Sequence, residues 1–112
     1  MALDPRRLVH ELQQVAAVPG ATLCRRPNSP VDAWSSYFAV LVVGRYRATV
    51  HVSDNHPYEH PRIEINPPPQ AAHYGGGSLC WAGPNEWKPT YTVAVAVIKA
   101  KHFMYLVARR QI

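Results

Sequence analysis

The sequence contains few cysteines and no long apolar run. Its two cysteines, Cys24 and Cys80, have dissimilar surroundings; a disulfide between them stays open, but a reducing compartment fits a lone exposed thiol better. No apolar run approaches the length that crosses a membrane, and the charged N-terminal residues lack a signal-peptide core. We therefore expect a soluble cytoplasmic protein that does not interact with membranes.

Internal repeats, low-complexity stretches and linkers are also missing. With 112 residues, 47% of them hydrophobic, the chain can bury a modest core, so we expect a single domain spanning residues 1–112. A net charge of +5 would permit nucleic-acid binding. The basic pairs at residues 6–7, 25–26 and 109–110 are scattered, however, and no aromatic stacking motif lies between them. A basic face for an acidic protein partner is at least as consistent, and we expect no nucleic-acid partner.

A helix is predicted at the start of the chain. The Asp-Pro pair at residues 4–5 supplies an N-capping carboxylate and a proline at the first helical position. Leu8, Leu12 and Val15 then recur at helical spacing and predict one apolar stripe. The Pro-Gly pair at residues 19–20 ends the helix.

Four strands are predicted to follow. The clearest predicted strand runs from Tyr46 to Val52 and alternates buried with solvent-exposed residues. His51 is on its solvent-exposed side. Cys24 is expected to be a small buried residue. Because short turns join the segments, the sequence predicts an antiparallel meander within an α+β domain. The predicted strands are residues 21–26, 34–43, 46–52 and 62–65, the last ended by prolines 67–69.

Residues 93–110 fit two patterns. Alternating valines at the start resemble a strand, whereas an apolar stripe at helical spacing runs through the whole segment. The length favours a helix, with Thr92 as N-cap and a basic pair at residues 109–110 beside the negative end of the helix dipole. The stripe consists of Val93, Val97, Ala100, Met104 and Val107.

The most unusual stretch is residues 73–92. Cys80 follows three glycines at residues 75–77, which permit backbone conformations and close approaches that other residues do not. Trp81, Trp87 and Pro89 are expected to pack this stretch against the core. The pattern indicates a loop that presents a thiol.

Three motifs, together with their order along the chain, resemble those of ubiquitin-conjugating enzymes. GSLC at residues 77–80 is similar to the glycine and Ile/Leu-Cys-Leu of the family's active site, and WKPTYT at 87–92 to its Trp-x-Pro-x-x-Thr. NHPYEHPRI at 55–63 is similar to the family's Tyr-Pro-x-x-Pro-Pro-x-Val block. The resemblance covers roughly residues 3–110. It implies the family's α+β fold, with an N-terminal helix, a four-stranded antiparallel meander, an active-site loop and a C-terminal crossing helix, and without the last family helices.

One segment departs from the family. HYG at residues 73–75 stands where the family has His-Pro-Asn, and the gap to Cys80 is shorter. The asparagine credited with stabilising the oxyanion is therefore missing. Such a minimal form resembles bacterial relatives in antiphage systems, above all the stand-alone conjugating enzyme that accompanies a cyclic-oligonucleotide synthase.

The chemistry expected of Cys80 is acyl transfer. A thiolate can take an acyl group from a thioester and pass it to an amine, with no metal or organic cofactor. The resemblance implies that the group is a protein C-terminus, of a ubiquitin-like protein or of the cyclic-oligonucleotide synthase, and that the acceptor is a lysine or other amine. Gly75, Gly76 and Gly77 could let the carried tail lie close to the backbone.

Further site residues are candidates with ordinary alternatives. Asn85 could replace the missing asparagine, or serve only as a turn residue. His73 could polarise the loop or deprotonate the acceptor amine, or hold the loop through a backbone hydrogen bond. Lys88 could favour the thiolate or be merely solvated. The resemblance also implies that an activating enzyme contacts the first helix, through Arg6, Arg7 and His10, which otherwise form an ordinary solvated face.

Other classes of function fit less well. A non-catalytic adaptor of the same fold, which binds a ubiquitin-like protein or a peptide, is the main rival. A zinc site of His56, His60, His73 and Cys80 would have spacings that match no common ligand pattern. A Cys-His hydrolase would need a third orienting group and a cleft, for which the chain leaves little room.

Overall fold

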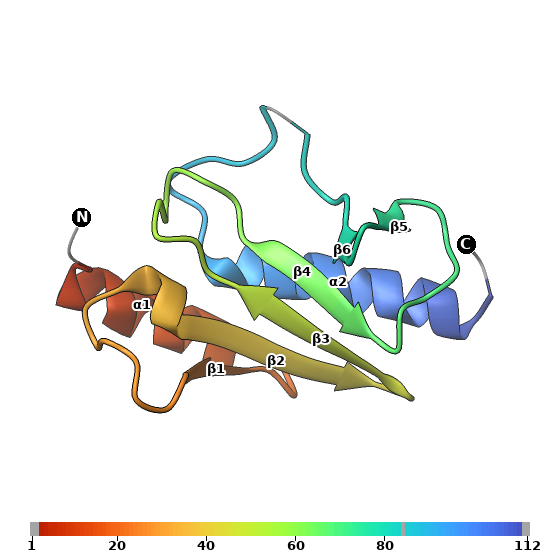
Figure 1. Ribbon diagram of the computed structural model, residues 1–112, viewed down its shortest axis with the longest axis horizontal. Coiled ribbons are helices and arrows are strands. Elements are labelled where there is room, and N and C mark those ends of the chain that lie inside the picture. The colour runs from red at the N-terminus through yellow and green to blue at the C-terminus, as the bar shows by residue number, and fades with distance from the viewer. Residues whose placement is uncertain (1–2, 84, 111–112) are drawn as a thin grey trace.

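The computed structural model describes residues 3–83 and 85–110 and shows an α+β fold with a four-stranded antiparallel sheet (Figure 1). The sheet order is β1-β2-β3-β4, so each strand pairs with the next along the chain and the predicted meander is confirmed. The elements are α1 (Pro5–Ala16), β1 (Thr22–Arg25), the 3₁₀ turn η1 (Trp34–Ser36), β2 (Tyr37–Val43), β3 (Tyr46–His51), β4 (Arg62–Asn66), β5 (Tyr74–Gly75), β6 (Ser78–Leu79) and α2 (Val93–Ala108).

Helix α1 begins where the sequence predicts, and its buried face matches the predicted stripe in part, since Leu8 also packs against the core. The Oδ1 of Asp4 accepts a hydrogen bond from the backbone N–H of Arg6 at 2.9 Å, and a proline occupies the first helical position. Val15 is fully buried, whereas Leu12 of the predicted stripe is 41% exposed. The buried face instead includes Glu11. Hydrophobic periodicity could not reveal this, because the groups that bond Glu11 come mainly from other segments.

The central strands follow the predicted alternation. Ala48 and Val50 of β3 are buried, and the residues between them face the opposite side of the sheet. Gly44, at φ +58°, makes the turn between β2 and β3. Strand β2 begins at Tyr37 rather than at residue 34, because η1 occupies the start of the predicted strand.

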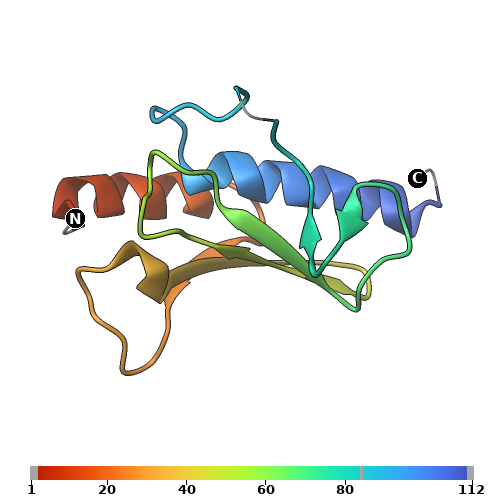
Figure 2. The same cartoon turned by 45° about the horizontal axis from the view of Figure 1, so that its top comes forward.

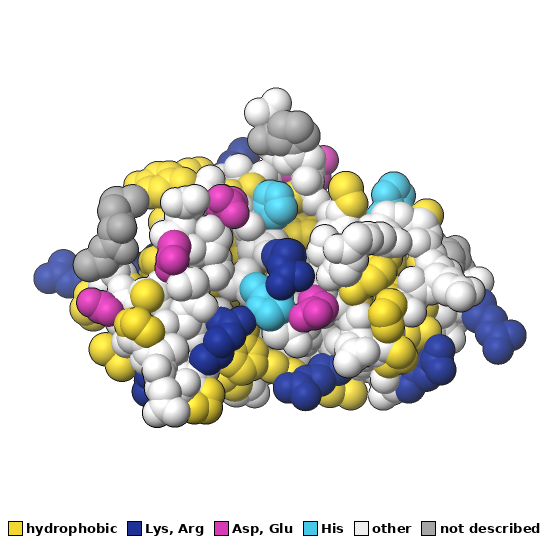
Figure 3. Space-filling view, viewed as in Figure 1, with side chains coloured by type: hydrophobic (Ala, Val, Ile, Leu, Met, Phe, Trp, Pro, Cys, Tyr) yellow, Lys and Arg dark blue, Asp and Glu magenta, His cyan; other side chains and the backbone are white. Residues whose placement is uncertain are grey.

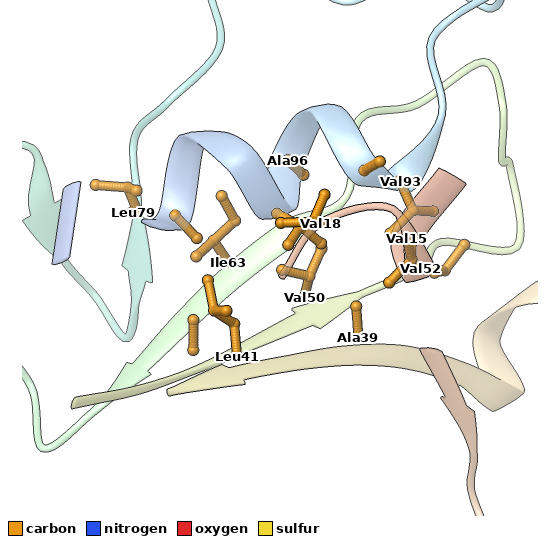
Figure 4. Close-up of a cluster of buried hydrophobic side chains, with 14 of the residues drawn as sticks. Val15, Val18, Ala39, Leu41, Val50, Val52, Ile63, Leu79, Val93 and Ala96 are labelled. Carbon is orange, nitrogen blue, oxygen red and sulfur yellow. The ribbon is translucent and has the colours of Figure 1, made fainter. Parts of the chain in front are cut away.

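Both helices lie on one face of the sheet (Figure 2). Helix α2 packs on β2 and β3, and α1 packs against α2 and β1. In the core between these layers, Val15 of α1 lies beside Val93 of α2 and Val52, which follows β3 (Figure 4). The predicted second helix is confirmed, with its stripe buried except for Val107, which is only partly buried. Neither helix in the described part of the chain has the length and apolar character needed to cross a membrane.

Two predictions are wrong for residues on the sheet face that no helix covers: the burial of Cys24 and the simple solvation of His51. Cys24 lies opposite Phe38 and is only partly buried, because no helix covers this side. His51 is not simply solvated: its Nδ1 lies 2.7 Å from Nη2 of Arg26 and its Nε2 lies 3.0 Å from Oε1 of Glu64. A guanidinium only donates, so Nε2 of His51 carries the ring proton and donates to Glu64.

Candidate functional site

The glycine run before Cys80 forms a tight hairpin. Strands β5 and β6 pair on either side of Gly76 and Gly77, whose φ angles are +61° and +81°. Positive φ at both central residues is the mark of a type I′ turn, which glycine adopts without strain. A Cβ on either glycine would meet nothing within 4 Å, so backbone conformation rather than crowding requires them. Their role in admitting a carried tail stays a prediction.

Tyr74 fastens this hairpin to the sheet. Its hydroxyl accepts a hydrogen bond from the backbone N–H of Ile65 at 2.9 Å and donates to the carbonyl of Ile65 at 3.0 Å. Ile65 belongs to β4, the last strand in the sheet order. One side chain thus satisfies a backbone pair at the sheet edge and holds the hairpin there.

Cys80 follows β6 directly and exposes its thiol. The preceding residue, Leu79, is buried in the core, and the backbone N–H of Cys80 donates to the carbonyl of His73 at 2.7 Å. Cys80 is exposed and forms no disulfide. The hairpin therefore fixes the backbone on both sides of its turn while leaving the sulfur accessible.

A shallow hollow of about 560 Å³ has Cys80 in its lining. It brings together two of the predicted catalytic residues, Cys80 and His73, and adds His60 from the loop before β4. The sequence pointed to His60 only as a zinc ligand, because nothing in the spacing links this loop to the cysteine. The hollow is lined by His60, His73, Tyr74, Gly75, Ser78, Leu79, Cys80, Trp81 and Ala82.

Two indoles pin the segment after Cys80 to the loop before β4. The Nε1–H of Trp81 donates to the carbonyl of Pro61 at 3.0 Å, and that of Trp87 donates to the carbonyl of Pro57 at 2.7 Å. The two rings stand almost perpendicular, with centroids 5.9 Å apart. The predicted packing against the core is confirmed for Trp81, whereas Trp87 packs on His56, Trp81 and Tyr91. Pro89 is exposed, because here the chain crosses to α2 over the surface.

Asn85 and Lys88 do not line the hollow of Cys80. They line a neighbouring one of about 380 Å³, which also includes Tyr91 and Lys99. The two hollows share Trp81 and Ala82. A catalytic role for Asn85 thus remains a prediction, and in this arrangement its side chain belongs to the adjacent surface.

Of the three α1 residues predicted to contact an activating enzyme, two are exposed and one is bonded inside the molecule. Arg6 and His10 are exposed and available to a partner. Arg7 is used inside the molecule: its Nε donates to Oε2 of Glu11 at 2.9 Å, its Nη1 to the carbonyl of Pro89 at 3.2 Å, and its Nη2 to the carbonyl of Tyr91. It ties α1 to the segment that leads into α2, which no local sequence pattern could indicate.

Glu11 is the centre of a buried network that the sequence did not predict. Its Oε1 accepts from the backbone N–H of Val93 at 2.7 Å, and its Oε2 accepts from Nε2 of His56 at 2.6 Å and from Arg7. Burial opposes its ionisation, but these hydrogen bonds outweigh burial and hold the pKa of Glu11 below its usual range. Thr92 occupies the predicted N-cap position of α2 but makes no side-chain capping bond. Glu11 instead accepts from the backbone N–H of Val93, the first residue of the helix.

His56 belongs to this network and does not line the hollow of Cys80. It is buried, and its ring stands edge-on to Trp34 with centroids 4.7 Å apart. Among residues 3–83 and 85–110, no group of three or more metal-ligating side chains lies close enough to hold an ion.

A comparison with models of known protein families and with curated proteins gave no match for this chain. The class of the protein is therefore defined by its own structure. It is an α+β domain whose meander and two helices hold an exposed cysteine beside two histidines.

Proposed function

We propose that the protein is a ubiquitin-conjugating-enzyme-like transferase, in which Cys80 carries a protein C-terminus as a thioester and passes it to an amine. The observation that carries this proposal is the exposed thiol in a hollow lined by His60 and His73. The order of elements supports it as well: a first helix, a four-stranded meander, a cysteine loop and a last helix packed on the sheet follow one another as in the ubiquitin-conjugating fold.

The reaction comprises two acyl transfers. In loading, Sγ of Cys80 attacks the carbonyl carbon of an incoming thioester; a new C–S bond forms and the donor thiol leaves. In discharge, an amine attacks the same carbon; a C–N bond forms, the C–S bond breaks, and the surplus proton of the amine passes to a base. Neither step changes an oxidation state, so the chemistry requires no cofactor.

The tetrahedral intermediate of both steps needs hydrogen-bond donors. The backbone N–H of Cys80 is not one of them, because it already donates to the carbonyl of His73. Asn85 remains the candidate side-chain donor in this loop. It would act once an incoming protein tail bridges the hollow of Cys80 and the neighbouring one, which adjoin through Trp81 and Ala82.

The partners follow from the same proposal. The carried protein is a ubiquitin-like protein or the cyclic-oligonucleotide synthase of a bacterial antiphage operon, and the acceptor is a lysine or other amine. An activating enzyme would contact α1 through its exposed Arg6 and His10. Arg7 would contribute indirectly, because it holds α1 against the segment before α2. The reaction would take place in the cytoplasm.

The test is to trap the carried protein in the native cell. Wild type, Cys80→Ser and Cys80→Ala are purified without reductant and weighed by mass spectrometry. We expect an adduct on the wild type that reductant removes, a stable ester on the serine variant, and no adduct on the alanine variant. Since Cys80 is exposed, these substitutions leave the fold intact and act on the chemistry alone. Three unmodified proteins from cells with an active operon would contradict the proposal.

A non-catalytic adaptor of the same fold is the second candidate. The observation in its favour is that residues 73–75, which stand in place of the family's His-Pro-Asn, lead into a glycine hairpin. Alkylation of Cys80 at neutral pH separates the two, because an inert thiol would favour the adaptor. Nucleic-acid binding has less support: on the face shown in Figure 3, Lys and Arg side chains are spread among acidic ones rather than gathered in a stripe.

A further inference from the structure

One carbonyl oxygen joins His60 to the residue that follows the cysteine. The oxygen of Pro61 lies 3.0 Å from Nδ1 of His60 and also 3.0 Å from Nε1 of Trp81. Pro61 itself is among the most deeply buried side chains of the molecule. The imidazole, the indole and the backbone that follows Cys80 are thus held to one fixed point.

This contact determines which nitrogen of His60 is available. A carbonyl oxygen only accepts hydrogen bonds, so Nδ1 of His60 carries the proton that it shares with Pro61. In the neutral ring, Nε2 then presents a lone pair and no proton. A histidine held in this tautomer is arranged to accept a proton at Nε2.

The ring of His60 borders the same hollow as Cys80, through which an attacking amine would approach the thioester. His60 is exposed and lines the hollow that contains Cys80. Its ring stands edge-on to that of Trp81, with centroids 5.3 Å apart and an interplanar angle of 78°. Packing and hydrogen bonding therefore both restrict the imidazole. His73 lines the same hollow, but the feature that marks it is its backbone, with φ at +67° and its carbonyl bonded to Cys80.

We propose that His60 is the general base of discharge, a role that rests on the proposed transferase function. Nε2 of His60 takes the surplus proton of the amine as the C–N bond forms and the C–S bond to Cys80 breaks. The proton then passes to solvent or to the departing thiolate, so His60 returns to its starting form. The other titratable groups beside His60 are His73, Tyr74 and Cys80 in this hollow, and Tyr58 and Glu59 in the hollow on its other side.

The experiment loads Cys80 without the native carrier. Purified full-length protein is acylated with a small probe, the mercaptoethanesulfonate thioester of acetylglycine, and the acyl-enzyme is followed by intact mass. Its discharge to free lysine is compared in wild type, His60→Gln and His102→Gln. His102 is an exposed histidine on α2 that lines neither hollow of His60, which makes it the matched control.

We expect His60→Gln to slow discharge to lysine by about 100-fold, in the range that a general base contributes, and His102→Gln to leave it unchanged. Discharge to hydroxylamine, a weakly basic amine that loses its proton readily, should change far less. Equal melting temperatures of the three proteins will show that the fold is retained.

The outcomes separate this inference from the function on which it rests. Failure of the probe to acylate wild-type Cys80 under conditions that acylate a free thiol would overturn both. Acylation followed by equal discharge in wild type and His60→Gln would overturn the role of His60 alone. A loss in His73→Gln with none in His60→Gln would place the base at His73 and contradict the proposal.

Discussion

At the scale of single residues, the structure depends on a buried carboxylate. Glu11 is fully buried, yet its two oxygens accept hydrogen bonds from His56, Arg7 and the backbone N–H of Val93. A buried charge is tolerated only when hydrogen bonds replace its lost hydration. Glu11 thus connects α1, the loop before β4 and the start of α2.

Glu11→Gln should destabilise the protein by about 3 kcal/mol, since it removes a charge that three donors solvate and places an NH₂ group among them. Urea unfolding monitored by tryptophan fluorescence measures the loss. Glu59→Gln is the control: Glu59 is exposed, and its amide analogue can still accept from Asn55. A difference of less than about 0.5 kcal/mol between the two variants would contradict the role of Glu11.

The same carboxylate predicts a pH dependence. Despite burial, hydrogen bonds lower the pKa of Glu11 in the folded protein. Its contribution is therefore fully present above the usual glutamate pKa of about 4.3 and is lost as the pH falls through the lower folded value. The stability gap between wild type and Glu11→Gln should be constant near neutrality and should shrink below about pH 4 in urea titrations. A gap that widens with acid would show that the sign is wrong.

At the scale of elements, the hairpin of β5 and β6 is a small unit that depends on one anchor. Its two strands are only two residues long each, so they form few hydrogen bonds of their own. The hydroxyl of Tyr74 attaches the hairpin to Ile65 at the sheet edge. The position of Cys80 therefore depends on a side chain outside the motif that identifies it.

Tyr74→Phe removes both hydrogen bonds to Ile65 and should lower stability by about 1–2 kcal/mol. Hydrogen exchange at residues 75–80 should accelerate more than exchange in β2 and β3, because the hairpin is released while the central sheet stays intact. Tyr58→Phe controls for loss of a hydroxyl, since Tyr58 is 68% exposed. Unchanged exchange in the hairpin would mean that Tyr74 does not anchor it.

At the scale of the whole molecule, the first helix and the segment before the last helix act as one unit. Arg7 donates to carbonyls of Pro89 and Tyr91, both more than eighty residues away in the chain. The same loop carries Trp87, whose indole is bonded to Pro57. The surface around Cys80 is therefore supported from the opposite end of the sequence.

Arg7→Lys tests this connection, because an ammonium cannot reproduce the planar fork of donors that contacts three acceptors. We expect a loss of about 1–2 kcal/mol in urea unfolding and faster hydrogen exchange at residues 88–92. Arg6→Lys, on the exposed side of the same helix, should change neither. Identical exchange in the two variants would refute the link between α1 and this loop.

Local chemistry was sufficient to predict most of the fold. The capping of α1 by Asp4, the alternation of buried residues along β3 and the length of the last helix each depend on neighbours in the chain. Those features were confirmed, with boundary shifts such as the 3₁₀ turn at Trp34–Ser36. The exposure of Cys80 after a glycine turn agrees with the predicted presentation of a thiol.

The sequence alone thus determined which segments become helices and strands, since propensity, capping and periodicity act over a few residues. Only the tertiary structure decided which side chains surround Cys80 and why Glu11 is buried. His60 joins the thiol because Pro61 and Trp81 bring two loops together, and Glu11 is buried because its donors come from α1, the loop before β4 and α2. Such contacts between distant segments leave no periodic trace in the chain, because they are selected by three-dimensional packing rather than by neighbours in sequence.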